Sequence, residues 1–472
     1  MTFRTPLLLL LVSCLVVGCN GTKKKDLPKI ETPPLSVTIV GDENMAAAIR
    51  RELAARTEEE IKVEVVTEEI LLNEKRFTND VLIYPPAMMG ELIKRDWIAP
   101  LPTATLGSEE LKLNDVALGI FQTETRWGSK PYALPLGSPV LMLMVRTDLL
   151  DQLGLDVPQT WDEYAAAVDT IQKSDLLTSS DTIAAATLEP LDEAYLPNLF
   201  LARSAAYVKH GENLSTYFDF ATGKARIETP GFTKAAQQLA DTAKTIPDAF
   251  NSLDPKASAE AFLAGKSVMA IGWINKHTIV PDTVPEAIQF AALPGSKQTY
   301  QTPENQWLPR PGNQGESIPL LSSSGMVGSI STVTGQTMNA ANLLVLLTGP
   351  ELISLISPPS ERTTLCRVSS LPMAEAWMPA NLPGTALRQY AQVNLEQLQS
   401  PRHLSALRLP NRKAYEQVLR EALQQTMADE DANVEAIWLE AAKSWDQLSE
   451  ESGQAQHIKA FRNSQGIGET AF

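Results

Sequence analysis

Residue patterns that support catalysis are incomplete in this 472-residue chain. The segment Ala264-Gly265-Lys266-Ser267 ends like a phosphate-binding P-loop, but Glu260 stands where that motif requires its upstream glycine. No G-x-S-x-G nucleophile elbow occurs, and the four histidines are too far apart for zinc-ligand spacing. These are His210, His277, His403 and His457. We therefore predict no catalytic residues, no metal site and no cofactor, and a protein that is not an enzyme.

Aromatic side chains that suit carbohydrates are plentiful. The apolar C–H face of a sugar ring packs on Trp or Tyr, while amides, carboxylates and guanidinium groups bond its hydroxyls. Four of the eight tryptophans fall in helical patterns, where core packing explains them better: Trp97, Trp161, Trp438 and Trp445. The other four fall near turns or strand ends: Trp127, Trp273, Trp307 and Trp377. This second group could stack on a sugar or pack at the rim of a cleft.

The elements that must position such groups alternate between strand and helix patterns. The segments 35–40 and 80–84 and the alternating segment 61–66 predict strands, and an amphipathic helix is expected at 45–56. This β-α-β spacing predicts a parallel sheet with helices on its faces.

Several polar and aromatic residues follow the predicted strands. Asp42, Glu43 and Asn44 come directly after the first strand, and Tyr84 ends the strand at 80–84. Open α/β sheets bind ligands at this edge, so these residues are candidate ligand contacts. The three polar residues could bond sugar hydroxyls or cap the following helix. Tyr84 and the later Tyr195 could line a cleft or be buried for structural reasons.

A longer stretch carries a recognisable order of elements. Residues 130–164 read K-P-Y-A-L-P, an apolar strand, T-D-L-L, G-L-D and P-Q-T-W-D-E-Y, with Thr160 and Glu163 spaced as a helix capping box. This order resembles the bacterial extracellular solute-binding proteins of sugar ABC transporters (family 1, the maltose-binding-protein type). Residues 260–273 resemble the family's F-x-x-G-K and G-x-W segment. The helices after Arg408-Leu409-Pro410 resemble its C-terminal end.

The resemblance implies a two-lobe α/β fold of the periplasmic-binding-protein type II. Each lobe is expected to be a mostly parallel sheet flanked by helices, with the ligand cleft between the lobes. The implied division places 35–137 and 325–366 in lobe I and 138–324 and 367–458 in lobe II. Residues 459–472 are expected to form a loose tail.

The resemblance also ranks the candidate site residues. Trp273 matches the family's G-x-W tryptophan, which often stacks on ligand, so it is the preferred candidate. Ser138, Ser324 and Gly325 fall at crossings between the lobes, where they could contact ligand or serve the hinge, and hinge geometry is favoured for Gly325. The polar segment 296–319, which carries Trp307, is interpreted as a long loop near the cleft mouth or an insertion.

Composition excludes some classes of function. The net charge is −16 and the pI is about 4.9, whereas a nucleic-acid-binding protein normally shows a basic face. An apolar content of 44% is ordinary for a globular protein. Of the three cysteines, only Cys366 lies beyond the N-terminal leader, so no intrachain disulfide is expected.

The N-terminus has the pattern of an export signal. Arg4 precedes an apolar run from Leu7 to Val17, which is too short for a membrane span. Val16-Val17-Gly18-Cys19 resembles the bacterial lipobox, which implies cleavage after residue 18 and a diacylglycerol on the Cys19 sulfur. The alternative is an ordinary signal peptide with an incidental cysteine. Residues 19–34 would then be a lipid-anchored tether on either the inner or the outer membrane.

Together these features predict a monomeric, lipid-anchored binding protein on the periplasmic or cell-surface side of a bacterial membrane. It would capture a sugar or oligosaccharide between its lobes and deliver it to the permease subunits of an ABC transporter. Two alternatives stay open, namely an anchored sensor or scaffold with the same fold and an anchored glycan-active enzyme.

Overall fold

The computed structural model describes residues 34–468, apart from positions 59, 181, 212, 286, 303–304 and 429–430. The predicted signal peptide, the lipidation site Cys19 and the tether up to residue 33 lie outside these residues. The chain from Leu35 onward forms one compact unit.

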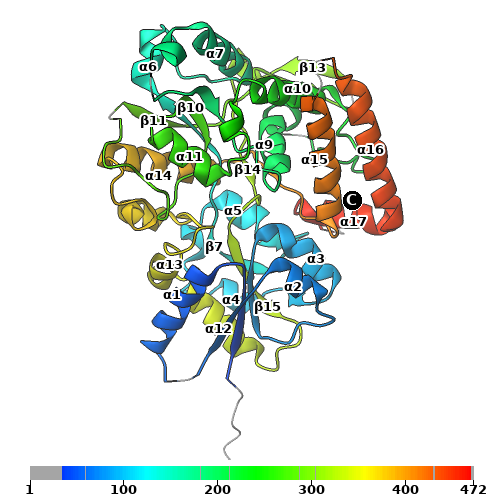
Figure 1. The fold of residues 1–472 in the computed structure, drawn as a ribbon. Helices are drawn as coiled ribbons and strands as arrows, with labels where there is room; N and C mark the ends of the chain where they lie inside the picture. Colours follow the sequence, from blue (N-terminus) through cyan, green and yellow to red (C-terminus); the bar gives the residue numbers. More distant parts are fainter. Residues whose placement is uncertain are drawn as a thin grey trace, which may run out of the picture. The chain divides into compact units, whose positions relative to one another are not determined.

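The first sheet contains the predicted N-terminal strands, and we call the part built around it lobe I. Its strand order is β2-β1-β3-β15-β4, with β7 also paired to β15. The strands are β1 Ser36–Val40, β2 Lys62–Val66, β3 Val81–Tyr84, β4 Ile98–Ala99, β7 Ala133–Gly137 and β15 Met326–Ser331. Its helices are α1 Glu43–Ala54, α2 Glu68–Asn73, α3 Met89–Lys94, α4 Thr103–Leu106, α12 Thr337–Thr348 and α13 Pro350–Ile356 (Figure 1). The three predicted strands and the helix predicted at 45–56 are confirmed.

The second sheet has the strand order β11-β8-β10-β9, and we call the part around it lobe II. The strands are β8 Met142–Arg146, β9 Ala185–Leu188, β10 Ser267–Gly272 and β11 Ile288–Ala292. Its helices are α6 Thr147–Gln152, α7 Trp161–Lys173, α8 Leu176–Ser179, α9 Leu196–Val208, α10 Pro230–Ala243, α11 Pro255–Leu263 and α14 Gly384–Leu398. The predicted capping box begins α7, where Thr160 Oγ1 accepts from Glu163 N at 3.2 Å. The residue boundaries predicted for the two lobes stay a prediction.

Each sheet contains one strand that runs against the others. In lobe I, β1 is parallel to β2 and β3, whereas β15 is antiparallel to β3, β4 and β7. In lobe II, β8 is antiparallel to β10 and β11, and β9 is parallel to β10. The reversed strands are those by which the chain enters each lobe. A crossing reaches each sheet at the edge where the neighbouring strands end. The strand that begins there therefore runs antiparallel to those neighbours.

Three segments carry the chain between the lobes. The first crossing (137–141) joins β7 to β8, the second (322–325) leads into β15, and the third (357–367) follows α13. The second crossing begins after β14 Leu320–Leu321, which pairs with β16 Leu404–Ser405. The helix α5 Leu118–Thr123 lies next to β7 and β14 and ends beside the crossings.

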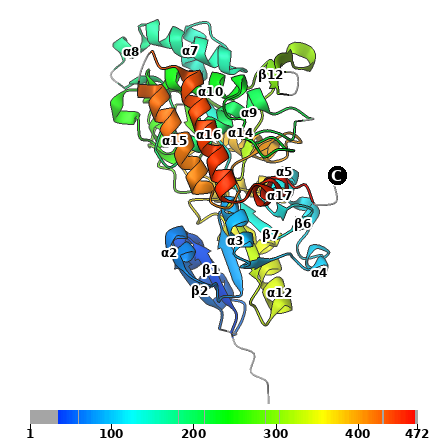
Figure 2. The same cartoon turned by 90° about the vertical axis from the view of Figure 1, so that its right-hand side faces the viewer.

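The C-terminal helices pack on lobe II. Helices α15 Arg412–Ala428 and α16 Val434–Glu451 lie side by side in Figures 1 and 2, and both contact α10. The chain then forms α17 Gln454–Ser464, so the prediction of a loose tail from 459 is wrong for 459–464. Phe461 is 1% exposed because its ring packs against Phe218, with the ring centroids 5.3 Å apart. Asn463 O accepts from Gly128 N at 2.7 Å, in the hairpin of β5 Arg126–Trp127 and β6 Lys130–Pro131.

Two further features concern segments outside the main sheets. The segment 296–319, expected to be a long loop, contains the hairpin of β12 Gln298–Gln301 and β13 Gln306–Pro309.

Among the described residues, no single helix is long and apolar enough to cross a membrane. The bent pair α12 and α13 passes that test together, by length and composition only.

A buried ion pair holds α9, whose N-terminal end reaches the candidate site. Arg203 Nη2 lies 2.5 Å from Glu189 Oε1, and both side chains are fully buried. Tyr164 Oη donates to the same carboxylate oxygen at 2.9 Å, and the guanidinium lies 4.1 Å from the Trp161 ring centroid. Removing one partner of a buried pair leaves the other charge without compensation, which costs about 3–5 kcal/mol.

We therefore expect Arg203→Met to lower the free energy of unfolding by about 3–5 kcal/mol, measured by urea denaturation. The double variant Arg203→Met/Glu189→Leu removes both charges and should regain most of that loss. Equal instability of the single and double variants would show that packing, and not the unpaired charge, causes the effect.

Candidate functional site

A cavity of about 900 Å³ lies between the carboxyl edges of the two sheets. Its lobe I wall follows β1, β2 and β3 and consists of Gly41, Asp42, Glu43, Asn44, Glu68, Pro85 and Ala87. Its lobe II wall includes Asp192, Ala194, Tyr195, Asn198, Asp254, Pro255, Lys256 and Trp273. The crossings and α15 add Ser323, Ser324, Glu361, Arg362, Arg412, Lys413, Glu416, Gln417 and Arg420. The sheet edge predicted from the strand pattern is therefore where the cavity lies.

The structure brings six of the eleven predicted ligand contacts to this cavity. They are Asp42, Glu43, Asn44, Tyr195, Trp273 and Ser324. The other five do not line it: Tyr84, Ser138, Trp307, Gly325 and Trp377.

Trp273 and Tyr195 form an aromatic corner on the lobe II wall. Their ring centroids are 5.2 Å apart, and the ring planes meet at 83°. Trp273 N donates to Pro255 O at 3.3 Å, and Tyr195 Oη lies 3.3 Å from Ser323 Oγ. The exposed fractions are 8% for Trp273 and 9% for Tyr195, so only a small part of each residue faces the cavity. The corner offers an apolar surface beside hydroxyl groups.

The polar residues after β1 have structural partners as well as a place in the cavity. Asp42 caps α1, because its Oδ1 accepts from Met45 N at 2.9 Å, and Ser360 Oγ donates to its Oδ2. Burial raises the pKa of the Asp42 carboxyl. Glu43 Oε1 forms an ion pair with Arg50 at 2.6 Å on the same helix. Helix capping and ligand contact are therefore compatible roles for Asp42.

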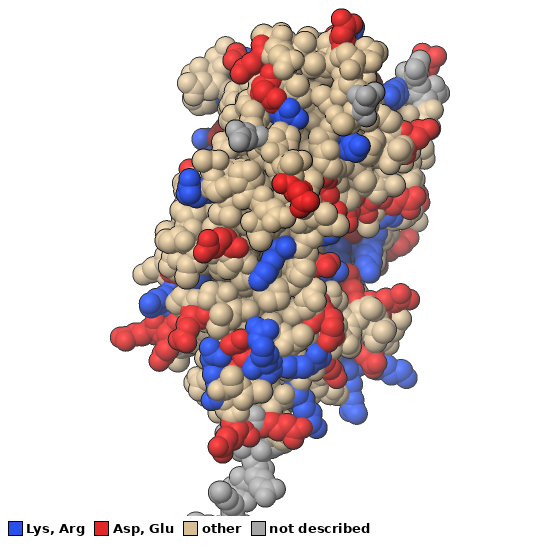
Figure 3. All heavy atoms as spheres, turned by 60° about the vertical axis from the view of Figure 1, so that its left-hand side comes forward, with Lys and Arg blue, Asp and Glu red and all other residues tan. Residues whose placement is uncertain are grey.

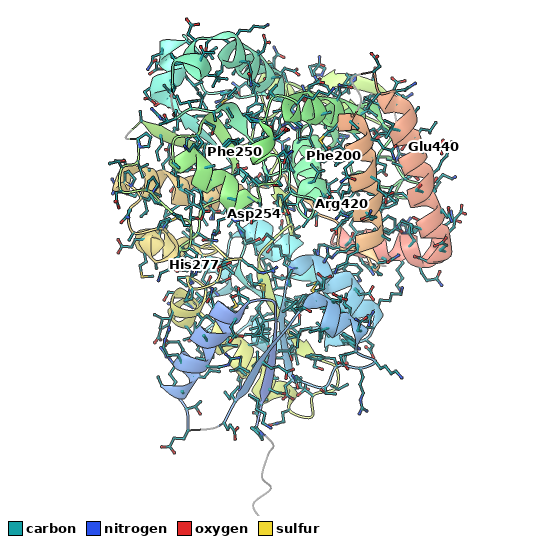
Figure 4. The ribbon with its side chains drawn as sticks, viewed as in Figure 1. Phe200, Phe250, Asp254, His277, Arg420 and Glu440 are labelled. Atoms are coloured by element: carbon teal, nitrogen blue, oxygen red, sulfur yellow. The ribbon has the colours of Figure 1, made fainter. Side chains whose placement is uncertain are left out.

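Each wall combines carboxylates with an arginine. On the lobe II side, burial and the neighbouring Asp254 carboxylate raise the pKa of Asp192, while Arg420 lowers it. Figure 4 shows Asp254 at the end of α11 and Arg420 on α15. On the lobe I side, Arg362 likewise lowers the pKa of the Asp42 carboxyl, against the larger effect of burial. The walls are close to charge balance, and Figure 3 likewise shows both signs interspersed on one face of the protein.

Sequence reasoning missed the residues that α15 contributes. Arg412 Nη2 lies 2.7 Å from Glu68 Oε1 of α2, and Arg412 Nη1 lies 3.0 Å from Glu416 Oε1. Lys413 Nζ also reaches Glu68, at 3.4 Å. The two pairs with Glu68 join lobe I to lobe II along one side of the cavity, whereas the pair with Glu416 lies within α15. Residues 68 and 412 are too far apart in sequence for any local pattern to indicate their contact.

Three predicted aromatic contacts are corrected by where the structure places them, two of them because the side chain is buried. Tyr84 is 0% exposed in the lobe I core, with its Oη 2.8 Å from Ser329 Oγ. Trp377 is 1% exposed, and its Nε1 donates to Ser357 Oγ at 3.0 Å. Trp307 lies on β13, where its ring packs edge-on against Tyr300 at 5.4 Å. All three pack against protein, away from the cavity.

The family of the protein follows from comparison with known sequences. The family model described as bacterial extracellular solute-binding protein matches residues 52–306, which is more than half of the chain. The chain belongs to this family. The predicted recognition and the solute-binding class are thereby confirmed, and the family's description places such a protein outside the cytoplasm. A search of curated proteins found no match.

Solved structures share the fold of this solute-binding protein at low sequence identity. The sugar-binding protein MalE from Xanthomonas citri is 16% identical with a TM-score of 0.65, covering 90% of this chain and 99% of that one. Maltose-bound MalE3 from T. maritima is 17% identical with a TM-score of 0.62, covering 88% and 100%. A solute-binding protein from Agrobacterium radiobacter K84 in complex with ribitol is 17% identical with a TM-score of 0.61, covering 88% and 98%. These matches confirm the predicted two-lobe α/β fold.

The two remaining residues, Ser138 and Gly325, belong to the hinge of the solute-binding protein. Gly325 has φ +97°, and a Cβ there would lie 2.6 Å from Ser138 Oγ. Ser138 is 1% exposed and its hydroxyl lies 3.0 Å from Ser324 O. These contacts support a role in hinge geometry, which was the predicted alternative to ligand contact.

Among the described residues, no group of His, Cys, Asp or Glu is arranged to hold a metal ion.

The hinge also contains a buried carboxyl that the sequence did not indicate. Glu124 follows α5 and is 0% exposed, and its Oε1 accepts from Ser138 Oγ at 2.8 Å. Burial raises the pKa of this carboxyl from 4.5 to about 7. The folded protein therefore holds the Glu124 proton more tightly than the unfolded chain does. Stability from this group is complete below pH 4.5 and is lost as the pH rises through 7.

We expect Glu124→Gln to remove this pH dependence. Between pH 5 and pH 8, the free energy of unfolding of the unsubstituted protein should fall by about 2–3 kcal/mol relative to that of the variant. Urea denaturation at both pH values measures the difference. The exposed Glu435→Gln is the control and should follow the unsubstituted protein. A constant difference between the Glu124 variant and the unsubstituted protein would contradict the prediction.

Proposed function

We propose that this protein captures a neutral sugar or oligosaccharide in the cavity between its lobes. The observation that carries the proposal is the Trp273–Tyr195 corner facing polar walls at the carboxyl edges of both sheets. Seven carboxylates and five cationic side chains line the cavity, and several of them pair with one another. A nearly balanced wall suits hydroxyl groups, which both donate to carboxylates and accept from guanidinium groups. Two of the three structures matched above were solved with ribitol and maltose, which are polyhydroxylated.

The proposed mechanism is a shift of population between conformations. A solute that touches both walls binds best when the lobes are close together, so binding favours the closed conformation. That conformation would dock on permease subunits of an ABC transporter, where other subunits hydrolyse ATP. The protein itself would carry out no catalysis and would need no cofactor. It would act as a monomer tethered by a lipid on Cys19.

The solute should be found by a thermal-shift screen of protein lacking residues 1–19, using mono- and oligosaccharides, polyols and sugar phosphates. A ligand at about 100 times its dissociation constant stabilises the folded state by roughly 2.7 kcal/mol. Trp273→Ala should weaken binding of the best solute by about tenfold or more, or about 1.4 kcal/mol, in calorimetric titration. Trp307→Ala is the matched control, since Trp307 lies away from the cavity, and it should bind like the unsubstituted protein.

Two results would overturn the sugar proposal. One is a well-folded protein that shows no shift with any solute class, which would favour the sensor or scaffold alternative. The other is equal loss of binding in the Trp273 and Trp307 variants. Release of products from the bound glycan would instead indicate the enzyme alternative.

The lipid anchor has its own test. Each buried acyl CH₂ contributes about 0.8 kcal/mol of membrane affinity, so two or three chains hold a protein firmly. We expect the full-length protein expressed in bacteria to enter the detergent phase on Triton X-114 partition, and Cys19→Ala to remain in the aqueous phase. The same aqueous partition for both proteins would contradict lipidation.

A further inference from the structure

A network of buried polar groups joins the three crossings at one point. Glu124 Oε1 accepts from Ser138 Oγ of the first crossing at 2.8 Å and from Ser322 N of the second crossing at 3.0 Å. Thr364 Oγ1 of the third crossing donates to Ser138 O at 3.0 Å. A single carboxyl group therefore contacts two crossings directly and the third through Ser138.

This carboxyl group is only partly satisfied. Glu124 has no exposed surface, and its Oε2 has no hydrogen-bond partner among the described residues. In an ionised Glu124, Oε2 would have neither bulk water nor a donor among the described residues, which disfavours the charged form. Any rearrangement that lets water reach Oε2 therefore stabilises the ionised form relative to the packed hinge.

Several charged and titratable side chains lie around Glu124. Arg408, which follows β16, donates to Glu124 O at 3.4 Å, and burial lowers its pKa only to about 10. Burial raises the pKa of the Cys366 thiol, in the third crossing, to about 12. Arg367, beside it, pairs with Asp115 at 3.4 Å. His403 touches the neighbouring Thr123, and burial lowers its pKa below 6.5.

We propose that Glu124 is a positioning residue that makes the arrangement of the lobes depend on pH. Its neutral form holds the three crossings packed as they are in this structure. Its ionised form favours conformations in which the crossings separate and water reaches the carboxylate. Because solute must contact both lobes, the affinity for solute would follow the same equilibrium, and this last step rests on the proposed function.

The linkage between proton binding and hinge conformation sets the size of the effect. If Glu124 has a higher pKa in the packed hinge than in the separated hinge, each pH unit above the higher pKa shifts the equilibrium away from the packed hinge by up to about tenfold. The shift should begin near pH 7, where the Glu124 carboxyl ionises. A rise from pH 6 to pH 8 should therefore change the distance between the lobes.

The test measures this distance without any solute. Spin labels are attached at Arg51→Cys in lobe I and Lys173→Cys in lobe II, where both native side chains are exposed. Pulsed electron–electron double resonance then measures the distance between the labels from pH 5.5 to 8.5. In protein lacking residues 1–19, Cys366 is the one remaining native cysteine. It is 2% exposed with a raised thiol pKa, so the labels go to the introduced thiols. We expect two distance populations whose ratio changes near pH 7. Adding Glu124→Gln should give the low-pH distribution at every pH, and Glu435→Gln should leave the change intact.

Three results would overturn the proposal. They are a pH-independent distribution in the labelled protein, a pH dependence that persists in Glu124→Gln, or its loss in His403→Gln. If Glu124→Gln does not fold, Ser138→Ala replaces it, because losing one donor to the carboxylate should move the midpoint to higher pH. An unmoved midpoint there also contradicts the proposal. Since the samples contain no solute, a failure of sugar binding leaves this result unaffected.

Discussion

The tight junction of the three crossings is the constraint on which the rest of the structure depends. A Cβ on Gly137 would clash with Thr364 O, and one on Gly325 would lie 2.6 Å from Ser138 Oγ, so the backbones meet where larger residues do not fit. The first crossing enters the lobe II sheet through β8, and the second enters the lobe I sheet through β15, each at the carboxyl edge of the neighbouring strands. This geometry reverses β8 and β15 and makes the two edges face one cavity.

The facing edges also explain why the cavity is rich in acidic side chains without being strongly charged. Helices begin at this edge, and their first N–H groups need acceptors. Asp42 caps α1, and Asp254 caps α11 by accepting from Ala257 N at 2.7 Å. The positive end of each helix dipole offsets part of the carboxylate charge. The same carboxylates can therefore stabilise the fold when the cavity is empty and still accept hydrogen bonds from a solute.

Local patterns predicted the fold better than the site. Thr160 and Glu163 form the capping box because their spacing alone determines it. Tyr84 and Trp377 were misplaced, because a position near a strand end does not say which way a side chain points. The helix α17 was missed because burial of Phe461 depends on Phe218, which is distant in sequence. No pattern in the sequence indicates Glu124, since its carboxyl group is shielded from solvent only when the hinge is folded.

The ion pairs around the cavity indicate how the lobes can move. On the side of α2 and α15, charges pair across the lobes, as in Arg412 with Glu68 at 2.7 Å, and Asn411 N donates to Glu91 of α3 at 3.1 Å. On the side of α1 and α11, charges pair within one helix, as in Glu43 with Arg50 and Lys256 with Glu260. Opening on the first side must break interlobe bonds, whereas opening on the second breaks none of these pairs. Separation of the lobes therefore breaks fewer of these bonds between α1 and α11, beside the Trp273–Tyr195 corner, than between α2 and α15.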